Sequence, residues 1–208
     1  MIEIEGKPFL EHQLNLLTEN GFKDIVLCVG HKSQAIKNYL KDGKKFGVRI
    51  KYSDEGDRLL GTCGALKKAK PLLNDVFLIM YGDSYLPFNF RRPVDFFEKF
   101  DKFGLMVVYR NRDRYERSNV ALEGLLVKEY GKDKKTEEMQ YIDYGVSIFR
   151  KKALELIPSD RVCDLPLLHR ALIEKNQLLA YEAKQRFYQI GSPEGLEEFR
   201  KYAKRHGL

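Results

Sequence analysis

The sequence has no apolar run long enough to cross a membrane, and it does not open with a charged segment followed by an apolar one. The first absence predicts a chain that does not span a membrane, and the second predicts no signal peptide. Internal repeats, low-complexity segments and linkers are also missing. We therefore expect residues 1–208 to form a single domain.

Cysteine is scarce in this chain. The three cysteines, Cys28, Cys63 and Cys163, are odd in number and far apart, so neither a metal-ligand spacing nor a disulfide framework is visible. Cys28 lies in an apolar run and Cys63 lies beside glycines. We expect buried, reduced thiols and a cytoplasmic protein.

The net charge of +7 is compatible with nucleic acid, an anionic membrane surface or phosphorylated small molecules as partners. The basic residues are spread along the chain, and the two richest stretches, 110–117 and 200–208, also contain acids or fit a solvated helix face. No zinc-finger spacing or aromatic RNA-binding signature accompanies them. We therefore expect neither nucleic acid nor a membrane as a partner, and leave a homo-oligomer open.

Strand-like and helix-like segments alternate through the first half of the chain. Residues 24–30, 76–82 and 105–110 are continuous apolar runs, as expected of strands that are buried on both faces. An amphipathic helix that carries Leu10, Leu14 and Leu17 precedes these runs. Between the runs, 33–40, 64–73 and 94–100 are typical of helices, and 48–53 alternates like a strand. This alternation predicts an α/β, Rossmann-like three-layer domain with a mostly parallel central sheet.

The pattern changes after residue 118. We expect a hairpin over 119–132 that turns at Glu123-Gly124. Strands are expected at 141–150, 178–183 and 186–191, and helices at 151–157 and 165–175. Ser33, Asp164 and Ser192 are predicted N-caps of three helices, the last with Pro193 at its first position.

Two stretches in the first half could bind a ligand. In "LLGTCGAL" (59–66), glycines before a helix allow backbone groups to approach a base or a phosphate, although a tight loop is the simpler explanation. In "FLIMYGDSYL" (77–86), an apolar strand ends at Gly82-Asp83. Ligands of open α/β sheets bind beyond the carboxyl ends of the strands, and a carboxylate there suits Mg²⁺ beside phosphates. A simple turn is equally consistent with this Asp.

Two further stretches lie in the second half. In "YIDYGVSIF" (141–149), Gly145 interrupts a bulky strand, which indicates close approach of a ligand or another backbone, or a bulge. In "YQIGSPEGL" (188–196), a glycine precedes a helix N-terminus that could face an anion or be an ordinary cap. We expect Gly61, Asp83 and Gly145 to line one cleft.

In this order and spacing, the four stretches resemble the sugar-phosphate nucleotidyltransferases, which are NDP-sugar pyrophosphorylases. "EGKPFLEHQLNLLTENGF" (5–22) resembles the segment that follows the family's signature loop. The combination of "SNV", "EYGKDKK…EMQYIDYG" and "FYQIGSPEGL" is similar to the heptose- or mannose-1-phosphate guanylyltransferase branch. The resemblance implies a nucleotide-diphospho-sugar transferase fold.

The resemblance also implies a reaction and its participants. A sugar 1-phosphate oxygen attacks the α-phosphorus of an NTP, and pyrophosphate leaves. Asp83 is the implied catalytic residue and magnesium ligand, with Gln189 at the second metal position. Implied nucleotide contacts are Gly61, Thr62 and, more weakly, Glu55. Implied substrate contacts are Lys7, Asp143, Tyr144 and Gly145.

Two departures from the family pattern stand out. The strand and the loop of form G-G-x-G-T-R-L, with the proline-lysine pair that follows, do not precede "GKP" here, so we expect a sheet that lacks its first, central strand. Gln189 stands where the family has a carboxylate. We therefore expect weak or absent activity, whether the cause is a gene model, a fragment or degeneration. The alternative is a non-catalytic nucleotide-sugar-binding or regulatory member. The nucleotide and the sugar are not indicated.

Overall fold

The computed structural model describes residues 1–131, 135–159 and 161–208. Residues 132–134 lie outside the described residues; residue 132 ends the predicted hairpin, and all three belong to the family-like segment "EYGKDKK". Within the described residues, no helix combines the length and the apolar character needed to span a membrane.

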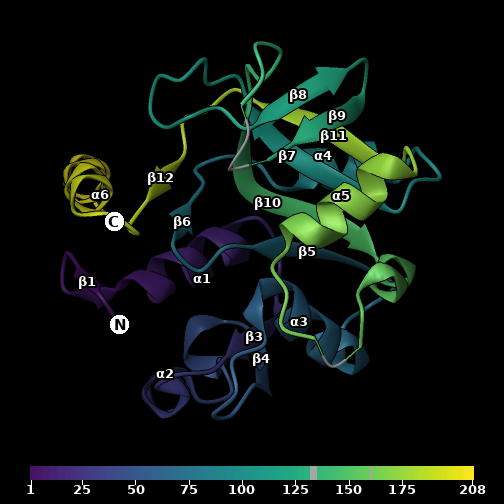
Figure 1. Ribbon diagram of the computed structural model, residues 1–208. Helices are drawn as coiled ribbons and strands as arrows, with labels where there is room; N and C mark the ends of the chain where they lie inside the picture. Colours follow the sequence, from purple (N-terminus) through teal and green to yellow (C-terminus); the bar gives the residue numbers. More distant parts are fainter. Residues whose placement is uncertain (132–134, 160) are drawn as a thin grey trace.

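The largest sheet has six strands (Figure 1). Their order is β5 (Val76–Met80), β10 (Ile142–Arg150), β7 (Gly104–Tyr109), β11 (Leu178–Ala183), β9 (Leu126–Tyr130) and β8 (Val120–Glu123). Since β10 is antiparallel to β5 and β7, and β11 is parallel to β7, β5, β7 and β11 run in one direction. β9 is antiparallel to β11 and β8, so β8 shares that direction. The predicted α/β fold with a mostly parallel sheet is confirmed, with β10 and β9 as the reversed strands.

A separate parallel sheet contains β3 (Asp24–Val29) and β4 (Arg49–Asp54). Among the described residues, no backbone hydrogen bond joins β3 to β5, so each of these strands has one edge without a neighbouring strand. In Figure 1 the β3–β4 pair lies below β5. The two-part sheet agrees with the expectation that the first, central strand is lacking.

The unpaired edges explain a wrong prediction about burial. We expected 24–30 and 76–82 to be buried on both faces. Instead, all five residues of β5 are only half-buried, and β3 is half-buried or exposed at every position except Val29. Cys28 is exposed for the same reason, whereas Cys63 and Cys163 are buried as expected.

Helices cover both faces of the six-stranded sheet. The α-helices are α1 (Phe9–Glu19), α2 (Ser33–Leu40), α3 (Gly61–Ala69), α4 (Arg91–Phe97), α5 (Pro166–Glu174) and α6 (Pro193–His206). Short 3₁₀ helices span Lys44–Phe46, Lys70–Leu72 and Lys151–Leu156, the last replacing a predicted α-helix. Leu105 and Val107 of β7 join one apolar cluster with α4 and α6, while Met106 and Val108 join another with α5. This alternation is that of a strand covered on both sides.

Two short pairings lie outside these sheets. A hairpin joins β1 (Glu3–Ile4) to β2 (Lys7–Pro8), and β6 (Ser84–Tyr85) pairs with β12 (Tyr188–Gln189). The strand expected over 186–191 is therefore only two residues long. It pairs with the segment after β5 and not with the main sheet.

Two of the three predicted caps are wrong. Ser192 does cap α6, because its hydroxyl accepts a hydrogen bond from the Gly195 N–H at 3.1 Å. Ser33 instead donates to Asp54 at 3.0 Å, and Asp164 accepts from Thr62. In both cases the polar side chain hydrogen-bonds to a residue far away in the sequence and does not cap its own helix.

Candidate active site

The turn after β5 carries Asp83, and three other elements hold it. The Tyr81 N–H donates to the Gly145 carbonyl of β10 at 3.0 Å, and the Ile190 N–H, next to β12, donates to the Asp83 carbonyl at 2.9 Å. From α1, the Gln13 side chain donates to the carbonyls of Tyr81 and Ser84. The Asp83 side chain is exposed, and its Oδ1 accepts from the Ser84 hydroxyl at 3.1 Å.

Gln189 lies beside Asp83, as the sequence predicts. A Cβ atom placed on Gly191 would be 3.3 Å from both Asp83 Oδ2 and Gln189 Oε1, so these two oxygens border the same small space. The Gln189 oxygen is already engaged, since it accepts the N–H groups of Gly191 at 2.6 Å and Ser192 at 3.1 Å. Its main role in the structure is to hold the start of α6.

Gly145 and Asp143 adjoin the same turn. Gly145 has a φ of +87°, and a Cβ there would be 3.1 Å from Ser84 Oγ. The close approach is thus to the Asp83 turn, and the β10–β7 register shifts between Asp143 and Ser147, which is the bulge that the glycine allowed. The signal in the sequence was correct, and the structure supplies the neighbouring segment.

Asp143 is surrounded by donors. Its Oδ1 accepts from the Gly145 N–H at 2.9 Å, and its Oδ2 accepts from the hydroxyls of Tyr130 at 3.1 Å and Tyr81 at 3.4 Å. Burial, and next the charge of Asp143, raise the pKa of both tyrosines, so each phenol remains a proton donor. These hydrogen bonds fix the Asp143 carboxylate beside the bulge at Gly145.

The Tyr144 side chain lies elsewhere. It is 1% exposed and packs against Phe88 and Phe187, with ring centroids 5.2 and 6.0 Å away. The expectation that it faces a sugar is wrong for the side chain, because adjacent residues of a strand point to opposite faces and Tyr144 points into the core.

Gly61 and Thr62 form the first turn of α3, not a loop before it. Gly61 has a φ of +72°, and a Cβ there would be 2.5 Å from the Cys163 carbonyl. The Thr62 N–H and hydroxyl donate to Asp164 Oδ1 at 3.2 and 3.3 Å. Within the described residues, no hydrogen bond joins Gly61 or Thr62 to the Asp83 turn. Their place in a shared cleft remains a prediction.

Glu55 and Lys7 also remain predictions as ligand contacts. Glu55 accepts the Leu60 N–H at 2.5 Å and so closes the loop that leads into α3. Lys7 is exposed on the β1–β2 hairpin. No hydrogen bond or ion pair of the described residues connects Lys7 to Asp83 or Gly145.

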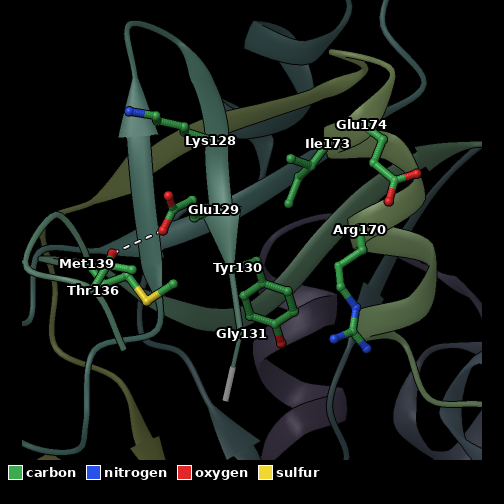
Figure 2. A pocket seen from close by; sticks show the side chains of 9 residues that line it. All are labelled: Lys128, Glu129, Tyr130, Gly131, Thr136, Met139, Arg170, Ile173 and Glu174. Carbon is green, nitrogen blue, oxygen red and sulfur yellow. Dashed lines mark hydrogen bonds between the residues drawn. The ribbon is translucent and has the colours of Figure 1, made fainter. Parts of the chain in front are cut away.

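Two hollows border this region. One of about 260 Å³ is lined by Gln189 and Ser192 together with Tyr115 and Arg186. The other, of about 380 Å³, lies between β9, the segment with Thr136 and Met139, and α5 (Figure 2). Its wall includes Tyr130, whose ring lies beside Arg170 in Figure 2 and whose hydroxyl reaches Asp143. Tyr130 therefore connects this hollow to the Asp143 cluster.

The donor set fits Mg²⁺ only in a limited way. No group of three or more His, Cys, Asp or Glu side chains that could hold a metal occurs among the described residues. Mg²⁺ is, however, commonly held by one or two carboxylates together with substrate phosphates. The exposed Asp83 oxygen suits a metal that arrives with a nucleotide, and it does not make a preformed metal cage.

Gln13 is the residue that the sequence reasoning missed. It lies on the apolar stripe of α1, between Leu10, Leu14 and Leu17, and is 1% exposed. A glutamine on such a stripe is a detectable signal, because a buried amide needs partners. Which partners it finds, 68 and 71 residues away, could not be read from the sequence.

Comparison with known proteins identifies the family. The model of the nucleotidyl transferase family matches residues 1–198. The chain belongs to this family. Among solved structures, this nucleotidyl transferase resembles HddC from Yersinia pseudotuberculosis, with a TM-score of 0.80, 22% identity, and coverage of 97% of this chain and 88% of the other. The inositol-1-phosphate CTP transferase from T. maritima also has a TM-score of 0.80, at 18% identity, covering 98% and 84%. At these identities the likeness shows the fold.

Curated relatives are named as sugar-1-phosphate nucleotidyltransferases. A UTP–glucose-1-phosphate uridylyltransferase of Synechocystis is 28% identical over 79% of this chain and 47% of its own length. A mannose-1-phosphate guanylyltransferase catalytic subunit beta of Drosophila pseudoobscura is 27% identical over 93% and 53%. A heptose 1-phosphate guanylyltransferase of Campylobacter jejuni is 38% identical over 41% and 38%. The chain spans about half the length, or less, of these relatives.

Proposed function

We propose that this domain catalyses transfer of a nucleoside monophosphate from an NTP to a sugar 1-phosphate, forming an NDP-sugar and pyrophosphate. The observation that carries the proposal is the convergence of Asp83, Gly145 and Gln189 at the end of β5, in a chain of the nucleotidyl transferase family. The similarity to mannose- and heptose-1-phosphate guanylyltransferases favours GTP and a sugar of that type.

Each residue has a distinct role in this proposal. Asp83 holds Mg²⁺ that arrives with the nucleotide, and the metal would orient the phosphates and neutralise their charge. Asp143, with its tyrosine donors, orients sugar hydroxyls, and the bulge at Gly145 brings that strand against the Asp83 turn. The α3 start with Gly61 and Thr62 is assigned to the base.

We expect weak activity from residues 1–208 alone. The reaction depends on positioning and on neutralising several phosphate charges. The Gln189 oxygen is neutral and already accepts two N–H groups, and the edges of β3 and β5 have no strand between them. These two observations also favour the second candidate function, which is nucleotide-sugar binding without turnover.

The test measures pyrophosphate release with GTP and other NTPs, using mannose-, glucose- and heptose-type 1-phosphates. We compare residues 1–208 with a version extended by an apolar strand and a G-G-x-G-T-R-L loop, and expect the extended protein to be faster by roughly 10³-fold or more. Equal rates would contradict our assignment of the charge-neutralising groups. Metal-dependent nucleotide binding without pyrophosphate release in both proteins would establish the binding function instead.

The role of Asp83 is tested in the more active version. Asp83→Ala should abolish Mg²⁺-dependent pyrophosphate release and leave the circular dichroism spectrum unchanged. The matched control is Asp95→Ala, which removes an exposed carboxylate from α4. Near-normal turnover of Asp83→Ala would refute the metal role.

A further inference from the structure

The side chain of Gln13 bridges the two ends of the turn that carries Asp83. Its Nε2 donates to the Tyr81 carbonyl at 2.9 Å and to the Ser84 carbonyl at 2.8 Å. One amide group has two N–H hydrogens, so a single Nε2 can serve both carbonyls. The side chain is 1% exposed, and α1, which carries it, lies more than sixty residues away in the chain.

The other contacts that distant segments make with the backbone of this turn come from backbone groups, while the Tyr81 hydroxyl donates to Asp143. Gly145 accepts the Tyr81 N–H, and Ile190 donates to the Asp83 carbonyl. Within the turn, the Ser84 N–H reaches the Tyr81 carbonyl only at 3.3 Å, which is long for such a bond. Among the described residues, Gln13 is the one side chain that hydrogen-bonds to carbonyls at both ends of the turn, and Asp83 lies between those two carbonyls.

We propose that Gln13 is a positioning residue for Asp83, which it orients toward the metal–nucleotide complex. The proposal rests on the proposed function for the metal role of Asp83, but the geometric part stands on the hydrogen bonds alone. A glutamine that only filled the core could be replaced by an apolar residue of similar size with little local effect. Removal of a positioning group takes a donor from the Ser84 carbonyl and leaves the Tyr81 carbonyl with the long Ser84 N–H bond, which loosens the turn between them.

The variant that separates these roles is Gln13→Met, which keeps the size and removes both donors. Backbone amide exchange reports the turn directly, through the N–H groups of Ser84 and Ile190, whose acceptors are the Tyr81 and Asp83 carbonyls. We expect both to exchange about tenfold faster or more, and the amides of β7 to be unchanged. Binding of the Mn²⁺–GTP complex, measured by isothermal titration calorimetry, should weaken about 10- to 100-fold, as is typical when a group supporting a metal ligand is lost.

Asn20→Ala is the matched control. Asn20 is also an amide at α1 that binds a distant backbone group, since its Oδ1 accepts the Phe90 N–H at 2.8 Å, but it does not contact the Asp83 turn. We expect this variant to lose stability without faster exchange at Ser84 and Ile190. If Gln13→Met does not fold, Gln13→Ala is used, because alanine favours the helix and leaves room for water.

Unchanged exchange at Ser84 and Ile190 in the Gln13 variant would overturn the proposal. An equal increase in Asn20→Ala would also overturn it, because the effect would then be a general loosening of α1. If the unmodified protein does not bind Mn²⁺–GTP, the assignment of GTP in the proposed function fails, and the exchange rates still decide whether Gln13 positions the turn.

Discussion

Acid should destabilise this protein through one buried imidazole. His169 on α5 is fully buried, with Nε2 3.2 Å from the Ser147 hydroxyl, and its Nδ1 has no hydrogen-bond partner among the described residues. The rings of Tyr130 and Phe149 pack beside it, with centroids 5.2 and 5.8 Å away. Burial lowers the pKa of His169 from 6.5 to about 3, so the folded protein keeps the ring neutral where the unfolded chain would protonate it.

The sign and the size of the effect follow from this difference. Because the folded pKa is depressed, the stabilisation is complete above the unfolded value of 6.5 and is lost as the pH falls toward about 3. One pKa unit corresponds to about 1.4 kcal/mol, so His169 should remove about 2.7 kcal/mol of unfolding free energy between pH 7.5 and pH 4.5. This is a large fraction of the stability of an ordinary domain.

The assay is urea unfolding at a series of pH values for the unmodified protein, His169→Phe and the control His31→Gln. The phenylalanine fills the space between the two rings and cannot protonate, so its unfolding free energy should fall about 2.7 kcal/mol less over this pH range. His31→Gln removes an exposed imidazole and should follow the unmodified protein. Carboxylate contributions are common to all three proteins. Identical pH dependence for His169→Phe and the unmodified protein would refute the reasoning.

Two other predictions concern the α3 start and β4. Gly61→Ala should lower the unfolding free energy by about 1–3 kcal/mol, since φ is +72° and the new Cβ meets the Cys163 carbonyl. The control is Gly124→Ala, where φ is +59° and nothing lies near the new Cβ. Equal loss of thermal stability in the two variants would contradict the clash at Gly61. Lys37 holds the pKa of Asp54 at about 2, so Lys37→Met should raise it toward 3.8 in an NMR titration, and no change would show that Gly56 and Ser33 suffice.

The positions of strands and helices could be predicted from the sequence better than the burial of those elements. Of the predicted segment 105–110, residues 105–109 lie in the buried central strand β7, because both neighbouring strands are present. Residues 76–80 have the same apolar composition, yet β5 is only half-buried because one of its edges is bare. The apolar composition of a segment indicates that it needs neighbouring strands and helices. It does not indicate whether the chain supplies those neighbours.

At the candidate site, too, the sequence indicated which positions are unusual but not which segments contact them. Glycine signals at Gly61 and Gly145 indicated close approach, and both positions have a positive φ and a near neighbour. The neighbours are the Cys163 backbone and the Asp83 turn, which sequence spacing cannot identify. Asp83 was predicted from its place after a strand, and its role stays a prediction. Gln13 was missed because its partners are carbonyls, which carry no sequence signal.

The bare edges of β3 and β5 connect stability with the proposed activity. A strand between them would pair two rows of backbone groups and bury the half-exposed side chains of Ile25, Leu27, Leu78 and Met80. If it ran parallel to β5, its carboxyl end would lie at the edge that carries Asp83, where ligands of such sheets bind. The extended protein used in the pyrophosphate assay should therefore gain thermal stability together with rate. A gain in rate without stability would mean that the added loop reaches the nucleotide without its strand entering the sheet, and the bare edges would then have no part in the activity.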